Sequence, residues 1–100
     1  MIIIWTDLAK FSYIEELEYI YHKWNTNETE KFAILVNDFI ESLKSGVLLG
    51  KTSDLTKIRS FVISKQTTLY FEFHKNKIEL LLFWNNQKDP KELKLLLSKK

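Results

Sequence analysis

The sequence predicts an α+β fold with an N-terminal strand, an antiparallel helix hairpin packed on one face of a twisted antiparallel sheet, and a short C-terminal helix. Three observations predict it. A β-branched opening segment leads into two stretches with helical spacing of apolar residues, and three short β-rich runs follow, separated by tight polar breaks. Of 100 residues, 45% are hydrophobic and only two are glycine and one proline, which favours regular elements in a single domain over residues 1–100.

The opening segment, residues 2–5, is Ile-Ile-Ile-Trp, which is typical of a buried strand. We expect it to join the sheet at an edge or beside the last strand. Thr6 or Asp7 can cap the helix that follows. The apolar stripe of that helix, at three- and four-residue steps, contains Leu8, Phe11, Ile14, Leu17, Ile20, Tyr21 and Trp24. The polar positions between them, which we expect on a solvated face, include Glu15, Glu16 and Glu18.

The second helical stretch has a cleaner stripe, which consists of Phe32, Leu35, Val36, Phe39, Ile40 and Leu43. Asn27 and Glu30 have the spacing of a capping box at its start. Gly46 stands where a glycine commonly ends a helix. Because the break between the two stripes is short, we expect the helices to form an antiparallel hairpin. Residues 45–57 are predicted as a loop, in which residues 47–49 make a small apolar contact.

Three β-rich runs at residues 58–63, 67–73 and 78–84 predict an antiparallel meander. After them, Asp89-Pro90 with Glu92 predicts a helix start, because aspartate caps, proline suits the first turn and glutamate lies three residues after the cap. The apolar face of this short helix consists of Leu93, Leu96 and Leu97.

Composition excludes several classes of chemistry. The chain has no cysteine, so disulfides and thiolate catalysis are excluded, and this suits the cytoplasm. His22 and His74 lie on different elements without metal-ligand spacing, so we expect no metal and no cofactor. The N-terminal apolar segment is too short for a signal or a membrane span, so we expect a soluble, cytoplasmic protein without a membrane partner. The net charge of +2 is too weak for a strong nucleic-acid-binding field.

The candidate functional surface is the sheet face opposite the helix hairpin, because one helix pair shields only one face. Arg59, the only arginine, lies in the first run of the meander, and Lys65 follows in the turn. The polar and aromatic candidates further along are Tyr70, His74, Trp84 and Gln87. Each also has a structural explanation: surface pairing for Arg59, solvation for Lys65, packing for the aromatic residues, and a turn or strand-end position for the other two.

Motifs for serine and cysteine catalysis are missing, and so is a glycine-rich phosphate loop. If the chain is an enzyme, the chemistry that remains is phosphodiester transfer. Arg59 would then stabilise the developing negative charge, and Lys65 or His74 would assist proton transfer. Composition and motifs leave open whether the chain is an enzyme.

A series of short segments, in order along nearly the whole chain, comprises Trp5-Thr6, Ala9, Tyr19-Ile20, Trp24, Lys31-Phe32, Ile58-Arg59, Phe61-Val62-Ile63, Tyr70 and Asp89-Pro90. This series resembles the RelE/ParE superfamily of bacterial type II toxins, also called plasmid-stabilisation proteins. The resemblance implies the fold predicted above and a cognate antitoxin that blocks the toxin. It also implies one of two activities: cleavage of mRNA on the ribosome, with basic residues on the open sheet face, or ParE-like poisoning of DNA gyrase without a nuclease site.

Arg59 matches the arginine that the superfamily carries on this strand, and Lys65 matches a frequent basic residue in the next turn. Gln87 stands where many members have an arginine, and no tyrosine follows Tyr70, although nuclease members often have one near the C-terminus. We therefore expect a growth-inhibiting toxin of the ParE-like kind, with DNA gyrase as a candidate target. A ribosome-dependent mRNA endoribonuclease and a degenerate, non-toxic interaction domain are the alternatives.

The last strand and the C-terminal helix carry much apolar surface, which suits a partner that adds a strand or a helix. We expect the antitoxin to cover this region. The candidate partner-binding residues are Arg59, Lys65, Tyr70, Trp84 and Gln87.

Overall fold

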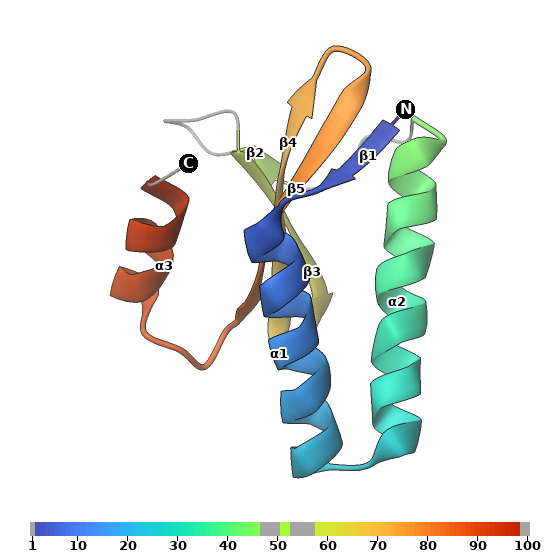
Figure 1. The fold of residues 1–100 in the computed structure, drawn as a ribbon, viewed down its shortest axis with the longest axis vertical. Helices are drawn as coiled ribbons and strands as arrows, with labels where there is room; N and C mark the ends of the chain where they lie inside the picture. Colours follow the sequence, from blue (N-terminus) through green and yellow to red (C-terminus); the bar gives the residue numbers. More distant parts are fainter. Residues whose placement is uncertain (1, 47–50, 53–57, 99–100) are drawn as a thin grey trace.

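The computed structural model describes residues 2–46, 51–52 and 58–98. Its elements, in chain order, are β1 (Ile2–Trp5), α1 (Asp7–Lys23), α2 (Thr26–Lys44), β2 (Lys51–Thr52), β3 (Ile58–Ser64), β4 (Thr67–His74), β5 (Lys77–Asn85) and α3 (Pro90–Ser98) (Figure 1). The predicted α+β fold is confirmed. The predicted loop over residues 45–57 contains the short strand β2, and the expected contact of residues 47–49 lies outside the described residues.

The described strands form one mixed sheet in the order β1-β5-β4-β3-β2. β3, β4 and β5 form the predicted antiparallel meander, with Leu69 opposite both Phe61 and Phe83. β1 lies at the edge of the sheet and beside β5, so both expected placements are confirmed, and it pairs in parallel, with Ile3 opposite Ile78. Parallel pairing requires a long connection, and the helix hairpin with β2, β3 and β4 supplies it between β1 and β5.

The predicted buried stripe of α1 is largely wrong. Phe11 is 68% exposed, and Ile14, Tyr21 and Trp24 are exposed too. The buried residues of α1 are Ala9, Ser12, Glu16 and Ile20. The polar residues Ser12 and Glu16 can be buried because each has a hydrogen-bond partner on the sheet. The larger apolar residues lie on the other side of the helix.

Capping residues set the ends of both long helices. Thr6 caps α1, because its Oγ1 accepts a hydrogen bond from the Ala9 N–H at 3.1 Å and donates one to the Leu80 carbonyl at 2.8 Å. Asn25 caps α2 by accepting from the Glu28 N–H at 2.9 Å, so the predicted capping box at Asn27 is wrong by two residues. α1 ends at Lys23 and α2 begins at Thr26, so Asn25 lies between the helices while Asn27 lies within the first turn of α2.

The predicted stripe of α2 is confirmed, apart from Leu35, which is exposed. Gly46 follows the helix with φ +88°, a left-handed conformation that suits glycine, and its N–H donates to the Leu43 carbonyl at 3.1 Å. Phe39 of α2 stacks on Phe61 of β3 with ring centres 4.1 Å apart. The helix hairpin therefore covers one side of the sheet, which we call the hairpin face.

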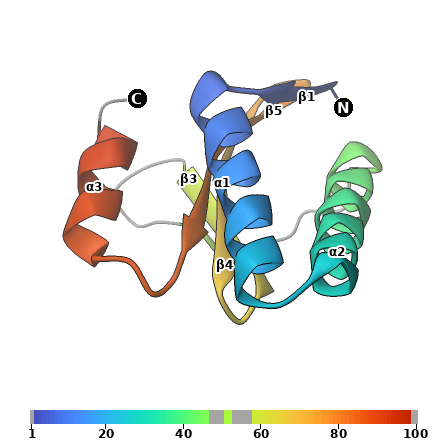
Figure 2. The same cartoon turned by 60° about the horizontal axis from the view of Figure 1, so that its bottom comes forward.

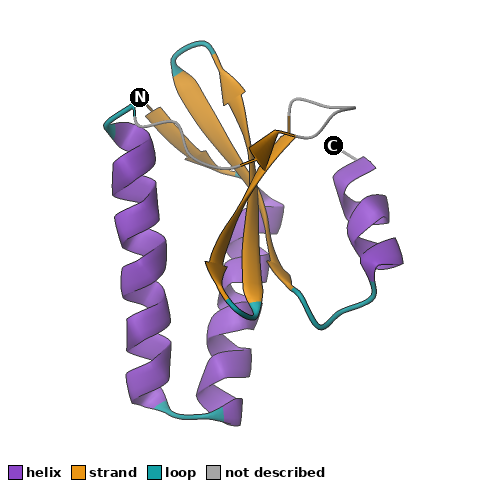
Figure 3. Ribbon diagram, turned by 180° about the vertical axis from the view of Figure 1, so that it is seen from behind, coloured by secondary structure: helices purple, strands orange, loops and turns teal. Residues whose placement is uncertain are grey.

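The opposite side, which we call the α3 face, is defined by Ile58, Leu82 and Trp84. Leu93, Leu96 and Leu97 of α3 pack against these residues, together with Leu8 of α1 and Tyr70 of β4. Figure 2 shows α2 and α3 on opposite sides of the strands. Seen from behind, the strands lie in front of α1, with α2 to one side and α3 to the other (Figure 3). The expectation of a wholly open second face is therefore wrong, because α3 covers part of it.

Candidate functional site

Arg59 lies on the hairpin face, so its predicted position on the open face is wrong. It pairs with Phe71 across β3 and β4, and it stands two residues from Phe61, which stacks on α2. Its guanidinium Cζ lies 5.0 Å from the centre of the Phe73 ring. Because neighbouring strand residues point to opposite faces, Ile58 fills the core under α3 and Arg59 must point the other way.

The three residues named as a candidate nuclease site do not converge. Lys65 lies in the turn before β4 and His74 at the far end of β4, a strand of eight residues that spans about 26 Å at ~3.3 Å per residue. His74 lies on the α3 face, and Arg59 lies on the hairpin face. One substrate phosphate therefore cannot contact all of them.

The partner-binding candidates are also dispersed. Trp84 is buried under α3, and Tyr70 packs beside the same cluster, where burial raises the pKa of its phenol. Gln87 is exposed, and its Oε1 accepts a hydrogen bond from the Tyr19 hydroxyl at 3.0 Å. Trp84 and Tyr70 therefore help to pack α3 against the sheet, and Gln87 lies on the surface beside α1.

A buried polar cluster, here called the polar corner, lies where α1 meets the ends of β4 and β5. It consists of Glu16, Thr67 and Asn85, and Glu16 is only 4% exposed. The Thr67 hydroxyl donates a hydrogen bond to the Glu16 carboxylate. Burial raises the pKa of Glu16, and hydrogen bonds from Thr67 and Asn85 and the charge of Lys88 oppose that rise. The prediction that Glu16 lies on a solvated face is therefore wrong.

Asn86 links Lys65 to the polar corner's end of the sheet. Its side-chain Nδ2 donates to the Lys65 carbonyl at 3.2 Å, and its Oδ1 accepts from the Thr68 hydroxyl at 2.8 Å. The Gln87 N–H donates to the Asn85 side chain at 2.9 Å. The fold therefore brings three predicted site residues, Lys65, Trp84 and Gln87, to one end of the sheet, although Trp84 is buried there.

A cleft of about 170 Å³ opens beside the polar corner, between α1, β5 and α3. Its lining includes Leu8, Ser12, Glu16, Trp84, Lys88 and Leu96. The Lys88 ammonium lies 3.6 Å from the Glu15 carboxylate and 5.6 Å from the centre of the Trp84 ring. The cleft is smaller than the ~300 Å³ of ordinary small-molecule sites, so it suits an inserted side chain better than a cofactor.

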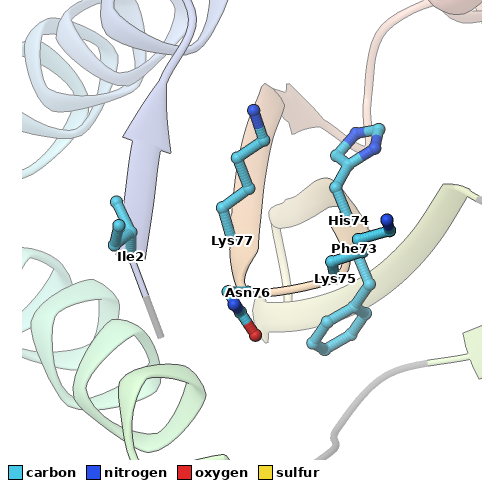
Figure 4. Close-up of a pocket in the computed structure, with 6 residues that line it drawn as sticks. All are labelled: Ile2, Phe73, His74, Lys75, Asn76 and Lys77. Carbon is cyan, nitrogen blue, oxygen red and sulfur yellow. The ribbon is translucent and has the colours of Figure 1, made fainter.

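A second, open hollow of about 540 Å³ lies at the turn between β4 and β5 (Figure 4). Lys75 in this turn has φ +33°, a conformation that few residues other than glycine adopt. His74 and Lys77 project to one side of the turn and Phe73 to the other. The hollow is lined by Ile2, Phe73, His74, Lys75, Asn76 and Lys77.

One side of α1 carries large exposed apolar residues. Phe11, Ile14 and Tyr21 are spaced at three and seven residues, which places them on one face of the helix, and all are more than half exposed. Exposed apolar residues grouped along one helix face are typical of a protein interaction surface.

Among the described residues, no helix is long and apolar enough to cross a membrane.

Comparison with known proteins gives matches to solved structures only. No protein-family model matches the chain, and no curated protein matches it. A chain of the chromosomal ParDE TA system from P. aeruginosa matches with TM-score 0.71 and 14% identity, over 85% of this chain and 95% of that one.

The YoeB dimer from Staphylococcus aureus matches with TM-score 0.57 and 16% identity, over 88% of this chain and 98% of that one. The heterotetrameric YoeB–YefM toxin–antitoxin complex of the same organism matches with TM-score 0.55 and 17% identity, over 86% and 95%. At these identities the matches show the fold. The fold that the resemblance implied is therefore confirmed.

Proposed function

We propose that this chain, which has the RelE/ParE-like fold, is the toxin component of a bacterial type II toxin–antitoxin system. The observation that carries the proposal is the similarity in fold, over 84–88% of the chain, to structures from the ParDE and YoeB–YefM systems. In this proposal the protein inhibits growth in the cytoplasm until its cognate antitoxin binds it.

The dispersed positions of Arg59, Lys65 and His74 support inhibition by binding, of the ParE-like kind, over mRNA cleavage. Phosphodiester cleavage needs cationic and proton-transferring groups on one scissile phosphate. Here the Arg59 guanidinium lies on one face of the sheet beside Phe73. The His74 imidazole lies on the other, 3.0 Å from the Glu72 carboxylate, which repels a phosphate. DNA gyrase is the candidate target under this proposal.

The antitoxin in this proposal covers α3 and the cleft beside it. Lys88 at this cleft offers a cation over the buried Trp84 ring, and Phe11, Ile14 and Tyr21 of α1 add exposed apolar surface. An antitoxin segment that inserts an apolar or acidic side chain at Lys88 fits this arrangement.

Inducible expression in a bacterium tests the proposal. We expect growth arrest, relief of the arrest by co-expression of the small neighbouring gene that encodes the antitoxin, and accumulation of gyrase–DNA cleavage complexes. Normal growth on expression of folded protein would support the degenerate-domain alternative. Arrest with newly cleaved mRNA on ribosomes, lost in Arg59→Ala, would support the endoribonuclease alternative.

A further inference from the structure

Two carboxylates and an imidazole converge on the α3 face at the end of the sheet near the β4–β5 turn. His74 Nε2 lies 3.0 Å from the Glu72 carboxylate and 3.1 Å from the Glu79 carboxylate. One ligand atom from each of the three side chains lies within 4.8 Å of the others. This cluster is separate from the polar corner and from the cleft under α3.

The strand register creates the cluster. Glu72 and Glu79 are direct partners across β4 and β5, and His74 follows two residues after Glu72 on the same face. Like charges directly opposite each other destabilise a sheet, so a cation bound by both carboxylates would relieve their repulsion. Glu72 is only 7% exposed, so water screens its charge poorly.

We propose that Glu72, His74 and Glu79 form a binding site for a divalent transition-metal cation, with Zn²⁺ as the best match. Zinc binds imidazole nitrogen and carboxylate oxygen at about 2.0–2.2 Å, and three protein ligands with an open position are typical of accessible zinc sites. Ligand atoms at that radius lie about 3.0–3.5 Å from one another in octahedral or tetrahedral geometry. The two distances from His74 fall in this range.

The burial of the three side chains suits an accessible site. The Glu72 side chain forms the buried floor, and the side chains of His74 and Glu79 are 36% and 32% exposed, which leaves an outer position for water. Lys77 stands across from His74 on the same face and is exposed. Its positive charge lowers the affinity for a cation, so we expect binding weaker than that of a closed structural zinc site.

A protonated His74 that bridges both carboxylates is the competing arrangement. A single Nε2–H cannot point at two carboxylate oxygens with full strength, whereas a metal ion bonds all three groups at once. The sequence predicts no metal, because the histidines lack metal-ligand spacing along the chain. The carboxylates reach His74 through pairing of two strands, and such pairing does not appear as a linear motif.

Isothermal titration of tag-free protein with ZnCl₂ tests the proposal. We expect saturable binding of one Zn²⁺ per chain and a higher melting temperature with Zn²⁺. His74→Ala and Glu79→Gln should each weaken binding about tenfold or more. His22→Ala, which removes the other histidine, is the matched control and should bind as the unchanged protein does.

Far-ultraviolet circular dichroism establishes that each variant is folded, and Glu79→Gln keeps the test valid if His74→Ala does not fold. Absence of stoichiometric binding would overturn the proposal. Binding that survives both ligand variants would overturn it too, because the ion would then occupy another place. If a proton on His74 alone bridges the two carboxylates, the titration shows no stoichiometric Zn²⁺ binding.

Discussion

The guanidinium of Arg59 lies over the ring of Phe73, with its Cζ 5.0 Å from the ring centre. Both residues point to the hairpin face, at the part of the sheet where the meander turns back at residues 75 and 76. A cation over an aromatic face stabilises the fold modestly, and the arginine stem adds apolar packing. The only arginine of the chain therefore has a structural role that needs no ligand.

We predict that Arg59→Ala lowers the free energy of unfolding by about 1 kcal/mol, because it removes both the cation and the stem from Phe73. Arg59→Met keeps most of the stem and should lose about half as much. Urea denaturation of the three proteins measures both effects. Equal stability of Arg59→Ala and the unchanged protein would exclude this role.

Ser12 makes a buried connection between α1 and the sheet. Its Oγ accepts a hydrogen bond from the Phe83 N–H at 2.9 Å and donates to the Leu8 carbonyl at 2.7 Å. Ser12→Ala leaves a buried N–H without a partner and should cost about 1–3 kcal/mol of unfolding free energy, although alanine favours the helix slightly. Ser42→Ala is the matched control.

The Ser42 hydroxyl donates only to the Asp38 carbonyl within α2, in an exposed position. Its removal should change stability by less than about 0.5 kcal/mol. If the two serine variants unfold at the same urea concentration, the Phe83 hydrogen bond does not stabilise the protein as described.

Glu16 should make stability depend on pH. Burial raises its pKa in the folded state, so the folded protein holds this proton at pH values where the unfolded chain has lost it. The stabilisation from the protonated carboxyl is complete below the ordinary pKa of 4.5 and is lost as pH rises through the raised folded value.

Glu16→Gln keeps a neutral partner for Thr67 and removes this titration. We therefore expect the difference in unfolding free energy between Glu16→Gln and the unchanged protein to shift in favour of the variant from pH 4 to pH 8. Denaturation curves at several pH values measure it. A difference that stays constant across this range would contradict a raised pKa for Glu16.

Leu96 anchors α3 against the α3 face, whereas its neighbour Leu95 is 62% exposed. Leu96→Ala should lower the unfolding free energy by about 1–2 kcal/mol, which is less than the loss at a fully buried leucine. Leu95→Ala should be close to neutral and serves as the control. Protection of α3 amide protons from exchange should fall in Leu96→Ala alone, and comparable loss in both variants would contradict the observed docking.

Much of the fold follows from local pattern. The apolar residues of α2 keep one helical period, and Val36, Phe39 and Leu43 all reach the core as that period requires. The meander follows equally, because each β-rich run ends at a polar break. These elements bury the residues that their own periodicity selects, so sequence alone predicts them.

The buried face of α1 could not be predicted in this way. Ser12 and Glu16 are buried through partners at Phe83 and Thr67, which are 71 and 51 residues distant in the chain. Local sequence does not indicate such distant partners, and hydrophobicity alone favours burial of Phe11 over Ser12. The position of Arg59 depended on α3 as well, since α3 supplies the second apolar layer that takes Ile58.

The site residues were least predictable, because the strand register decides which of them meet. Register brings Glu72, His74 and Glu79 together and separates His74 from Lys65. A shift of one residue in the register of a strand would move each of its side chains to the opposite face of the sheet.

The most direct test of the account is a map of mRNA 5′ ends in cells that express the unchanged chain, taken at the onset of growth arrest. If the protein inhibits growth by binding a target, the map at that moment matches that of uninduced cells. New 5′ ends inside the coding regions of translated messages would contradict the account.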